Sequence, residues 1–258
     1  MNLLITGSTG IAAATAKLAA SSGVSIFVVS NDKESCAALA NEIRASGAGC
    51  DFFVGDLVEE KTSIAAVEKC LQRFSRLDAL FNVVGISGRK FGDGAIHECT
   101  ESGWDITLDT NVKTTFLMSR EVIKQMLQQE INDAGLRGTI LNMSSVLADF
   151  PEPKNFASHA YAASKGAINS LSKAMAAYYA PHKIRVNVIA PGLIRTPMSK
   201  RAQENSAIVE FMKIKQPLAA DLLDVEEVAK AALFLLGDAS RHITGDVMKI
   251  DGGWSVSG

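Results

Sequence analysis

Short apolar runs alternate with helical patterns along almost the whole of this 258-residue chain, and no other feature restricts the fold as strongly. The apolar runs are about five residues long and end at turn residues, whereas the segments between them keep helical periodicity over roughly ten residues or more. The predicted strands are residues 3–5, 25–29, 51–54, 79–81, 139–143, 184–191 and 247–251, and the predicted helices are residues 11–22, 33–46, 61–73, 100–129, 159–180 and 225–236. This alternation predicts an α/β fold, a doubly wound parallel sheet with helices on both faces.

The composition gives no reason to divide the chain, so we predict one domain over residues 1–258. No Pro/Gly/Ser-rich linker, repeat or low-complexity segment interrupts it, and 47% hydrophobic residues are enough for a large core. The net charge is −2 and no block of Lys and Arg stands out. We therefore expect neither a nucleic acid nor a membrane as partner.

The cysteines, histidines and N-terminus favour a reduced, cytoplasmic protein. The four cysteines are scattered without C-x-x-C spacing (Cys36, Cys50, Cys70 and Cys99). No second His follows His97 at metal-ligand spacing, so we expect no metal site. No apolar run approaches the ~18 residues of a membrane span, and the N-terminal segment lacks the basic start of a signal peptide. A cytoplasmic enzyme is the resulting expectation.

A glycine-containing turn follows the first predicted strand. The segment TGSTGIA at residues 6–12 opens the first predicted helix. Its glycines allow the backbone to turn tightly and to approach a pyrophosphate at the helix N-terminus. A plain strand-to-helix turn is the alternative, but ligands of doubly wound sheets bind at the carboxyl ends of the strands, where this turn lies.

Two further loops end neighbouring strands of the predicted sheet. Gly55, Asp56 and Leu57 follow the third strand, and residues 82–85 follow the fourth. An aspartate at the first loop can accept a hydrogen bond from an adenine amino group, and a turn of small residues at the second lets a cofactor pass close to the backbone. Together the loops favour a dinucleotide site.

Tyr161 and Lys165 are spaced one helical turn apart, so a phenol and an ammonium project from one helix face. An ammonium beside a phenol favours the phenolate, which is a proton-transfer catalyst. Lowering the pKa of a tyrosine from ~10 to about 7 requires about 4 kcal/mol, more than an exposed pair supplies. The spacing alone is therefore weak, and its meaning depends on the site around it.

These motifs, taken in order, resemble those of the short-chain dehydrogenase/reductases of about 250 residues with a Tyr-x-x-x-Lys pair. The resemblance covers essentially the whole chain. It rests on the TGxxxGxG-like turn at 6–12, Asp56, NVVG at 82–85, Asn111, Ser145 in NMSS, Tyr161, Lys165, IRVNVIAPG ending at Gly192, Thr196, and ITGDVMKIDGG at 243–253. It implies a single Rossmann-type domain with about seven strands in the order 3-2-1-4-5-6-7, and a homo-oligomer, usually a tetramer.

The resemblance also implies roles for individual residues. Tyr161 is the general acid/base, and Lys165 lowers its pKa and binds the nicotinamide ribose. Ser145 holds the substrate oxygen, and Asn111 anchors a water that links Lys165 to solvent. The implied cofactor contacts are Gly7, Ser8, Thr9, Gly10, Ile11, Ser30, Asn31, Asp32, Asp56, Leu57, Asn82, Val83, Val84, Gly85, Tyr161, Lys165, Pro191, Gly192, Ile194 and Thr196, with Asn187 nearby.

Three features depart from the family pattern. The glycine turn is one residue shorter than usual, and Ala12 replaces its last glycine. Val83 and Val84 add bulk where Asn and Ala usually stand. The segment between Ser145 and Tyr161 is about three residues longer than common, which enlarges the loop beside the substrate.

The choice between NAD and NADP depends on the end of the second strand. An acidic residue there binds the ribose diol of NAD, and a basic one binds the phosphate of NADP. Ser30 and Asn31 are neither, Asp32 could reach a ribose, and Lys33 could favour a phosphate. We expect NAD as the cofactor, with NADP as the alternative.

The resemblance places the substrate between residues 86–94, 146–156 and a substrate loop at about 193–216. Apolar candidates for its contacts are Ile86, Leu147, Phe150, Ile194, Met198, Phe211 and Met212, beside Ser145. Arg89 could pair with an anionic group. Such a lining suits a hydroxyl or keto compound with apolar parts.

The resemblance implies an NAD(P)-dependent oxidoreductase that interconverts a secondary alcohol and a ketone by hydride transfer. Within the family, a 3-oxoacyl-thioester reductase or a sugar/polyol dehydrogenase is the alternative, whereas an enoyl reductase is disfavoured because its Tyr and Lys are usually further apart. A non-catalytic dinucleotide-sensing protein usually lacks the Tyr or the Lys. The alternative that the chain is an epimerase or dehydratase is supported only by the shortened glycine turn.

Overall fold

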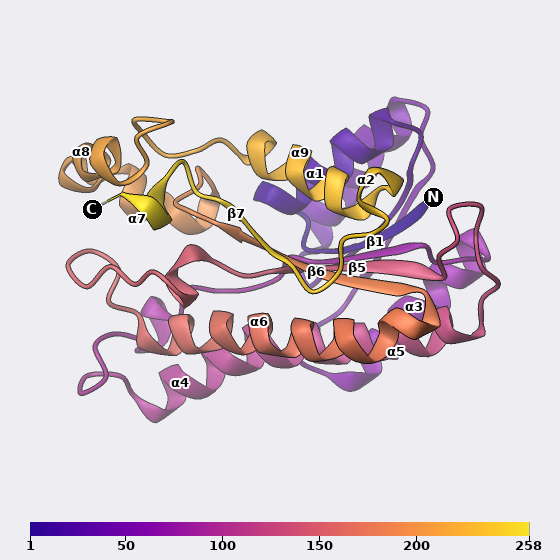
Figure 1. The fold of residues 1–258 in the computed structure, drawn as a ribbon, viewed down its shortest axis with the longest axis horizontal. Coiled ribbons are helices and arrows are strands. Elements are labelled where there is room, and N and C mark those ends of the chain that lie inside the picture. Colours follow the sequence, from indigo (N-terminus) through magenta and orange to yellow (C-terminus); the bar gives the residue numbers. More distant parts are fainter. Residues whose placement is uncertain (258) are drawn as a thin grey trace.

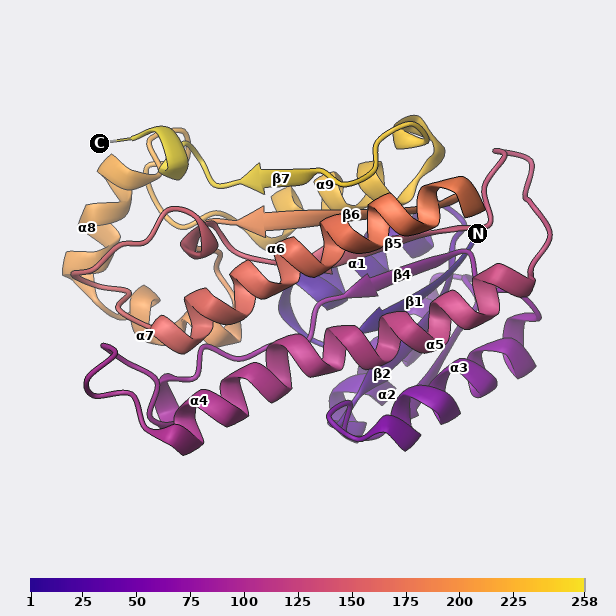
Figure 2. The ribbon, with the colours of Figure 1, turned by 60° about the horizontal axis from the view of Figure 1, so that its bottom comes forward.

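A computed structural model describes residues 1–257 as a parallel sheet covered by helices on both faces (Figure 1). The described residues contain seven strands in the order β3-β2-β1-β4-β5-β6-β7, which confirms the predicted order. The strands are β1 (Asn2–Thr6), β2 (Ser25–Ser30), β3 (Cys50–Val54), β4 (Ala79–Asn82), β5 (Gly138–Met143), β6 (Ile184–Pro191) and β7 (Val247–Ile250). All pair in parallel, so their carboxyl ends lie at one edge, toward α7 and α8 in Figure 2.

The helices form one layer on each face of the sheet and a group at its carboxyl edge. One face carries α1 (Gly10–Ser21), α2 (Lys33–Ala45) and α9 (Val225–Leu236), and the other carries α3 (Glu60–Phe74), α4 (Glu101–Leu108), α5 (Thr114–Gln128) and α6 (His159–Tyr179). At the carboxyl edge lie α7 (Lys200–Gln203) and α8 (Ser206–Lys215).

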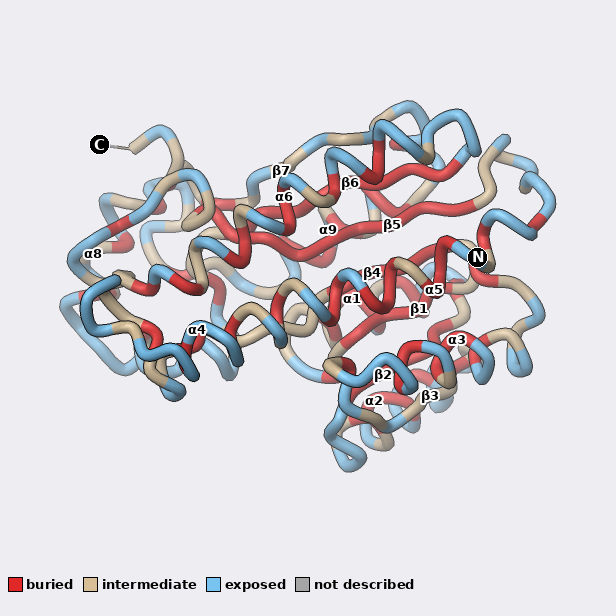
Figure 3. The backbone as a smooth tube through the Cα atoms, turned by 90° about the horizontal axis from the view of Figure 1, so that it is seen from below, coloured by how far each residue is buried: buried red, intermediate tan, exposed pale blue. Residues whose placement is uncertain are grey.

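Alternating strand residues divide the core into two layers because successive side chains of a strand point to opposite faces. Leu3 and Ile5 of β1 pack into the cluster beneath α1, α2 and α9, whereas Leu4 packs into the cluster beneath α3, α5 and α6. Figure 3 shows the result as buried strands between helices that are buried on one side only. Both faces of the central strands are thus apolar, as their continuous hydrophobic sequence predicts.

Two details differ from the predicted elements. The helix predicted over 100–129 is interrupted by a π-helical turn, η2 (Asp109–Lys113), between α4 and α5. The segment predicted as a substrate loop, 193–216, contains α7 and α8, which cover a third apolar cluster that includes Met212 and Trp254. Met212 is fully buried there and Phe211 packs against the same cluster, so neither residue lines the cavity of the described chain.

Candidate active site

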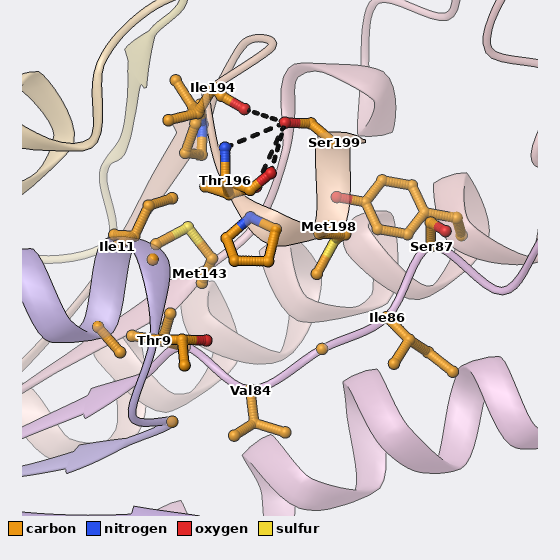
Figure 4. A pocket seen from close by; sticks show the side chains of 18 of the residues that line it. Thr9, Ile11, Val84, Ile86, Ser87, Met143, Ile194, Thr196, Met198 and Ser199 are labelled. Carbon is orange, nitrogen blue, oxygen red and sulfur yellow. Dashed lines mark hydrogen bonds between the residues drawn. The ribbon is translucent and has the colours of Figure 1, made fainter. Parts of the chain in front are cut away.

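The carboxyl ends of the strands open into a cavity of about 540 Å³. Its lining includes most of the predicted cofactor contacts, namely Gly7, Ser8, Thr9, Gly10, Ile11, Ser30, Asn31, Asp32, Val83, Val84, Gly85, Tyr161, Lys165, Pro191, Gly192, Ile194 and Thr196. Of the predicted substrate contacts, it includes Ile86, Leu147, Met198 and Arg89. Figure 4 shows Thr9 and Ile11 on one side of this cavity and Ile86, Ser87 and Met198 on the other.

The glycine turn fits a pyrophosphate despite its shortened sequence. Gly7 and Gly10 have φ angles of 95° and 54°, which side-chain-bearing residues rarely adopt. The first residues of α1 line the cavity, and within residues 1–257 no side chain caps this helix and no acidic residue stands in its first turn. An uncapped helix N-terminus at a cavity is suited to bind an anion.

Thr196 lines the cavity close to the glycine turn. A Cβ on Gly10 would lie 3.4 Å from Cγ2 of Thr196. Ser199 fixes this position, because its hydroxyl donates to the Ile194 carbonyl (2.6 Å) and accepts from the Thr196 amide (3.0 Å). The dashed bonds in Figure 4 show this arrangement, which places Thr196 beside the space for a pyrophosphate.

The end of β2 supplies a polar wall. Asp32 caps α2, with its Oδ1 accepting from the amides of Glu34 (3.0 Å) and Ser35 (3.2 Å). Within residues 1–257, Oδ2 of Asp32 accepts no hydrogen bond. The hydrogen bond from the Ser35 amide lowers the pKa of Asp32. This carboxyl lines the cavity and is ionised at neutral pH.

Several predicted cofactor residues lie outside the cavity lining. Asp56 is exposed and accepts from the Val58 amide (3.0 Å), whereas Leu57 is buried in the second core layer. Asn82 is also buried, and its Nδ2 donates to Ser119 Oγ (3.0 Å) and Asn142 Oδ1 (2.9 Å). The side chains of these residues support the loops rather than face the cavity.

Phe150, predicted for the substrate side, and Asn187, predicted for the nicotinamide side, also lie outside the lining. Phe150 packs in the third cluster, where its carbonyl accepts from the indole of Trp254 (3.2 Å). Asn187 donates to the Ile243 carbonyl (2.8 Å) between β6 and β7. Both side chains tie segments together behind the cavity wall.

Tyr161 and Lys165 meet at the floor of the cavity. The Lys165 Nζ lies 5.6 Å from the centroid of the Tyr161 ring and donates to the Met143 carbonyl (2.9 Å). Burial lowers the pKa of Lys165 to about 8. Ser145 is buried and is not among the residues that line the cavity, and its hydroxyl accepts from the Leu147 amide (3.2 Å).

The pKa of Tyr161 moves in the direction opposite to the predicted one. Burial raises it above the ordinary value of a tyrosine, and the nearby Ser145 hydroxyl opposes this without reversing it. The physical reason is that the phenolate is desolvated here, while Lys165 directs its ammonium to the Met143 carbonyl. The protein residues alone therefore keep Tyr161 protonated at neutral pH.

Asn111 lies at the centre of the π-helical turn η2 and is fully buried. Its Oδ1 accepts from the Ile86 amide (2.7 Å), and its Nδ2 donates to the Ile86 carbonyl (3.0 Å) and to Ser164 Oγ (2.9 Å). The side chain thus joins the loop after β4 to α6. A π turn inside a helix often marks a functional site. Asparagine has a low propensity for the middle of a helix, so Asn111 itself was the sequence signal for such a site.

Asp93 caps the first turn of α6, a role that the sequence did not indicate. The N-cap residue of α6, Ser158, forms no side-chain cap bond within the described chain. The carboxylate of Asp93 takes this role, because its Oδ1 accepts from the Ala160 amide (2.9 Å) and its Oδ2 from the Tyr161 amide (3.0 Å). A side chain distant in sequence therefore fixes the start of the helix that carries Tyr161 and Lys165.

Two features are absent from residues 1–257, a group of metal-ligand side chains and a helix of membrane length. No three His, Cys, Asp or Glu side chains in this range are grouped as ligands for an ion. None of the helices there is long and apolar enough to cross a bilayer.

All the known proteins that this chain resembles below are named or described as reductases or dehydrogenases. Residues 5–255 match a family model described as enoyl-(acyl carrier protein) reductase. The chain is 33% identical to the 3-oxoacyl-[acyl-carrier-protein] reductase FabG of Thermotoga maritima, over 97% of this chain and 96% of that protein. It is 35% identical to an A-factor type gamma-butyrolactone 1′-reductase of Streptomyces virginiae, over 98% and 95%. The structure of a short-chain type dehydrogenase/reductase from Mycobacterium ulcerans superposes with a TM-score of 0.89 at 27% identity, over 99% of this chain and 90% of that one.

Proposed function

Because this chain belongs to the short-chain dehydrogenase/reductase family, we propose that it interconverts a secondary alcohol and a ketone, with Tyr161 exchanging the proton. It is an NAD(P)-dependent oxidoreductase of CH–OH and C=O groups. The observation that carries the proposed role is the juxtaposition of Tyr161 and Lys165 at the floor of a cavity that also contains the uncapped N-terminus of α1.

Tyr161 acts as the acid in ketone reduction and as the base in alcohol oxidation. Its raised pKa keeps the phenol protonated at neutral pH, which is the form that donates to a developing alkoxide. The Ser145 hydroxyl is the second donor to the same oxygen. Lys165 holds positive charge below its pKa of about 8, which favours the phenolate formed when the proton leaves. The cofactor supplies or accepts the hydride.

The chain's own residues fit a dinucleotide along the cavity. The amides of the glycine turn and the Thr196 hydroxyl would bind the pyrophosphate, and the polar groups of Ser30, Asn31 and Asp32 would hold the adenosine ribose. We propose NAD over NADP, because the ionised Asp32 lines this part of the cavity and repels a phosphate. Asn111 would connect Lys165 to solvent through an anchored water.

The segment 193–216 is the proposed substrate-binding segment. Its first half lines the cavity with Leu193, Ile194 and Met198, opposite Ile86 and Leu147. These apolar side chains favour a ketone with hydrophobic parts over a polyol. A 3-oxoacyl reductase, the activity named for the Thermotoga maritima relative, is the proposed alternative. An enoyl reductase is less well supported, because the Tyr and Lys of such enzymes stand further apart than four residues.

We also propose a cytoplasmic homo-oligomer, most simply a tetramer. Cys36, Cys50 and Cys70 are buried free thiols, as expected in a reducing compartment. Large apolar side chains remain exposed along the helices of one face, including Trp104, Phe116 and Leu127. Such residues often pack against a second copy.

The test is a panel of alcohols and ketones assayed with NAD and NADP, using Tyr161→Phe as the diagnostic variant. The substitution removes only the hydroxyl, so we expect at least a 100-fold lower kcat with an unchanged melting temperature. Tyr178→Phe, which removes the hydroxyl of an exposed tyrosine outside the cavity lining, is the matched control and should keep wild-type turnover. Full turnover by Tyr161→Phe would show that another group transfers the proton.

A further inference from the structure

Two arginines from distant segments converge at the cavity. Arg89 belongs to η1 (Arg89–Phe91), after β4, and Arg201 belongs to α7, after β6. Both line the cavity. The Nη2 of Arg89 donates to the Asn155 carbonyl (3.2 Å), and the Nη2 of Arg201 donates to the same oxygen (3.1 Å). The two guanidinium groups are therefore close neighbours, joined through one neutral acceptor.

No carboxylate in residues 1–257 forms an ion pair with either guanidinium. The nearby acidic groups have other partners. Asp93 accepts from the Ala160 and Tyr161 amides, and Glu152 accepts from the backbone of the segment that presents the Asn155 carbonyl. Burial lowers the pKa of Arg89 and the charge of Arg201 lowers it further, whereas the charge of Asp93, which forms no ion pair with Arg89 in residues 1–257, opposes both effects without reversing them. The two guanidinium groups therefore repel each other.

This pair lies on the substrate side of the cavity. Arg89, Asn155 and Arg201 belong to the segments after β4, β5 and β6, whereas Asp32 and its neighbours end β2 on the other side of β1. The pair therefore cannot serve the adenosine end. Apolar side chains, including Leu147, Phe156 and Trp254, line the cavity together with the two arginines.

Resting on the proposed function, we infer that Arg89 and Arg201 bind an oxyanion, a carboxylate or a phosphate, carried by the alcohol or ketone substrate. Two guanidinium groups present several N–H donors in planar arrays, which match the oxygens of such a group. The substrate class is thus a keto or hydroxy acid, or its phosphate counterpart, with an apolar segment between the reacting carbon and the anion.

A purely structural role does not account for the pair. A single arginine would satisfy the Asn155 carbonyl, and a second one adds charge repulsion without a new acceptor. The two like charges line the same part of the cavity, and no carboxylate of residues 1–257 forms an ion pair with either of them. A bound anion would remove their repulsion.

The experiment compares charged and neutral versions of the same carbonyl compound. The panel contains straight-chain oxo acids of increasing carbonyl-to-carboxylate separation with their methyl esters, and 4-oxopentyl phosphate with 5-hydroxypentan-2-one. We expect the wild-type kcat/KM to favour the anionic member at least tenfold in one series, and that series identifies the oxyanion. In Arg89→Met/Arg201→Met this ratio should fall to near one, and Arg89→Lys/Arg201→Lys should keep part of it. Arg241→Met, an exposed arginine outside the cavity lining, is the control and should keep the wild-type ratio.

Calorimetry with glutarate and its dimethyl ester tests the same inference without turnover. Wild-type protein should bind glutarate at least tenfold more tightly than the ester, and the double Met variant should lose that difference while keeping its melting temperature. If the double Met variant does not fold, the single variants Arg89→Met and Arg201→Met are measured instead. An anion preference that is absent from the wild type, or that persists in the arginine variants, would overturn the inference. If no carbonyl compound is turned over, the proposed function fails, while the glutarate comparison still decides the role of the arginines.

Discussion

Lys165 is a cation that folding removes from water. Its side chain is only 3% exposed, and its ammonium has the Met143 carbonyl as hydrogen-bond acceptor within the described chain. Burial lowers its pKa from 10.5 to about 8. Holding this charge inside the protein therefore costs stability at neutral pH, and the cost serves the proton transfer assigned to Tyr161.

This cost should be visible as a pH dependence of unfolding. Below pH 8 Lys165 is charged in both states, and the folded state bears the full cost. Between pH 8 and 10.5 the folded protein releases this proton first, so the cost disappears as the pH rises. For Lys165→Met, the stability gain relative to wild type should shrink by about 3 kcal/mol between pH 7 and pH 10.5.

Urea unfolding of both proteins across this range measures the difference. Titration of the buried thiols affects both proteins and cancels in the subtraction. Because Lys165 influences Tyr161, the comparison is made in the Tyr161→Phe background, in which that phenol is absent. Lys173→Met, an exposed lysine on the same helix, is the control and should give a flat difference. A flat difference for Lys165→Met as well would mean that Lys165 has an ordinary pKa.

The sequence predicts a site residue when the groups that it contacts lie close to it in the sequence. Tyr161, Lys165 and the glycine turn act through short spacings, so the sequence indicates them. Asp93 accepts hydrogen bonds from amides that are more than 60 residues away in the sequence, at Ala160 and Tyr161. Nothing in the residues around a loop aspartate indicates such a distant contact. Arg201 was missed because the rotation of α7, set by the burial of Ala202, decides which basic side chain reaches the cavity.

At the scale of elements, α6 is a helix whose beginning is held by another segment. Asp93, in the connection between η1 and α4, accepts from two amides of its first turn. The carboxylate is 6% exposed and also lies at the positive end of the helix dipole. The position of the helix that carries Tyr161 and Lys165 therefore depends on the connection after η1.

Replacing Asp93 by Ala should weaken both the fold and the site. Two buried amides lose their acceptors, so we expect the free energy of unfolding to fall by about 2 kcal/mol. The kcat should fall at least tenfold, because the backbone of Tyr161 is no longer fixed. Asp93→Asn keeps one acceptor oxygen and should recover part of both losses.

Asp105→Ala, on the exposed side of α4, provides the matched control, and its stability should change by less than about 0.5 kcal/mol. Chemical denaturation and steady-state kinetics measure the two effects. Equal stability of Asp93→Ala and wild type would mean that the carboxylate contributes nothing to the start of α6.

The strands were predicted within one or two residues because buried parallel strands are continuous apolar runs between turn residues. The π turn was missed because one widened turn hardly changes the helical spacing of apolar residues over 100–129, so the sequence pattern is nearly that of an uninterrupted α-helix. α7 and α8 were missed because short helices depend on tertiary packing rather than on propensity. Val146 and Trp254, which lie under α8, come from segments far away in sequence.

At the scale of the whole molecule, the cavity joins segments from both halves of the sheet. The glycine turn and Asp32 belong to the first half, and Tyr161, Thr196 and Arg201 to the second. A ligand that spans the cavity therefore bridges the two halves. Its binding free energy adds to the free energy of unfolding, because the unfolded chain has no such site.

NAD should accordingly raise the melting temperature more than NADP at equal concentration. At 100 times its Kd, a ligand adds about 2.7 kcal/mol, or roughly 5 to 10 °C for a domain of this size. Asp32→Asn keeps the oxygen that caps α2 but removes the charge, so it should shift the preference toward NADP. Glu34→Gln, an exposed neighbour, is the control. Tenfold tighter binding of NADP than NAD to the wild type would refute the proposed preference.

The strand order has a consequence for the way the chain can assemble during synthesis. β2 and then β3 extend the sheet on one side of β1, and β4 to β7 extend it in turn on the other side. Each newly made strand therefore joins an open edge, and none has to enter between two strands already paired. The sheet can therefore grow strand by strand while the chain is being synthesised. Tyr161, Lys165 and Thr196 belong to the segments after β5 and β6, so they join a sheet whose first strands are already paired.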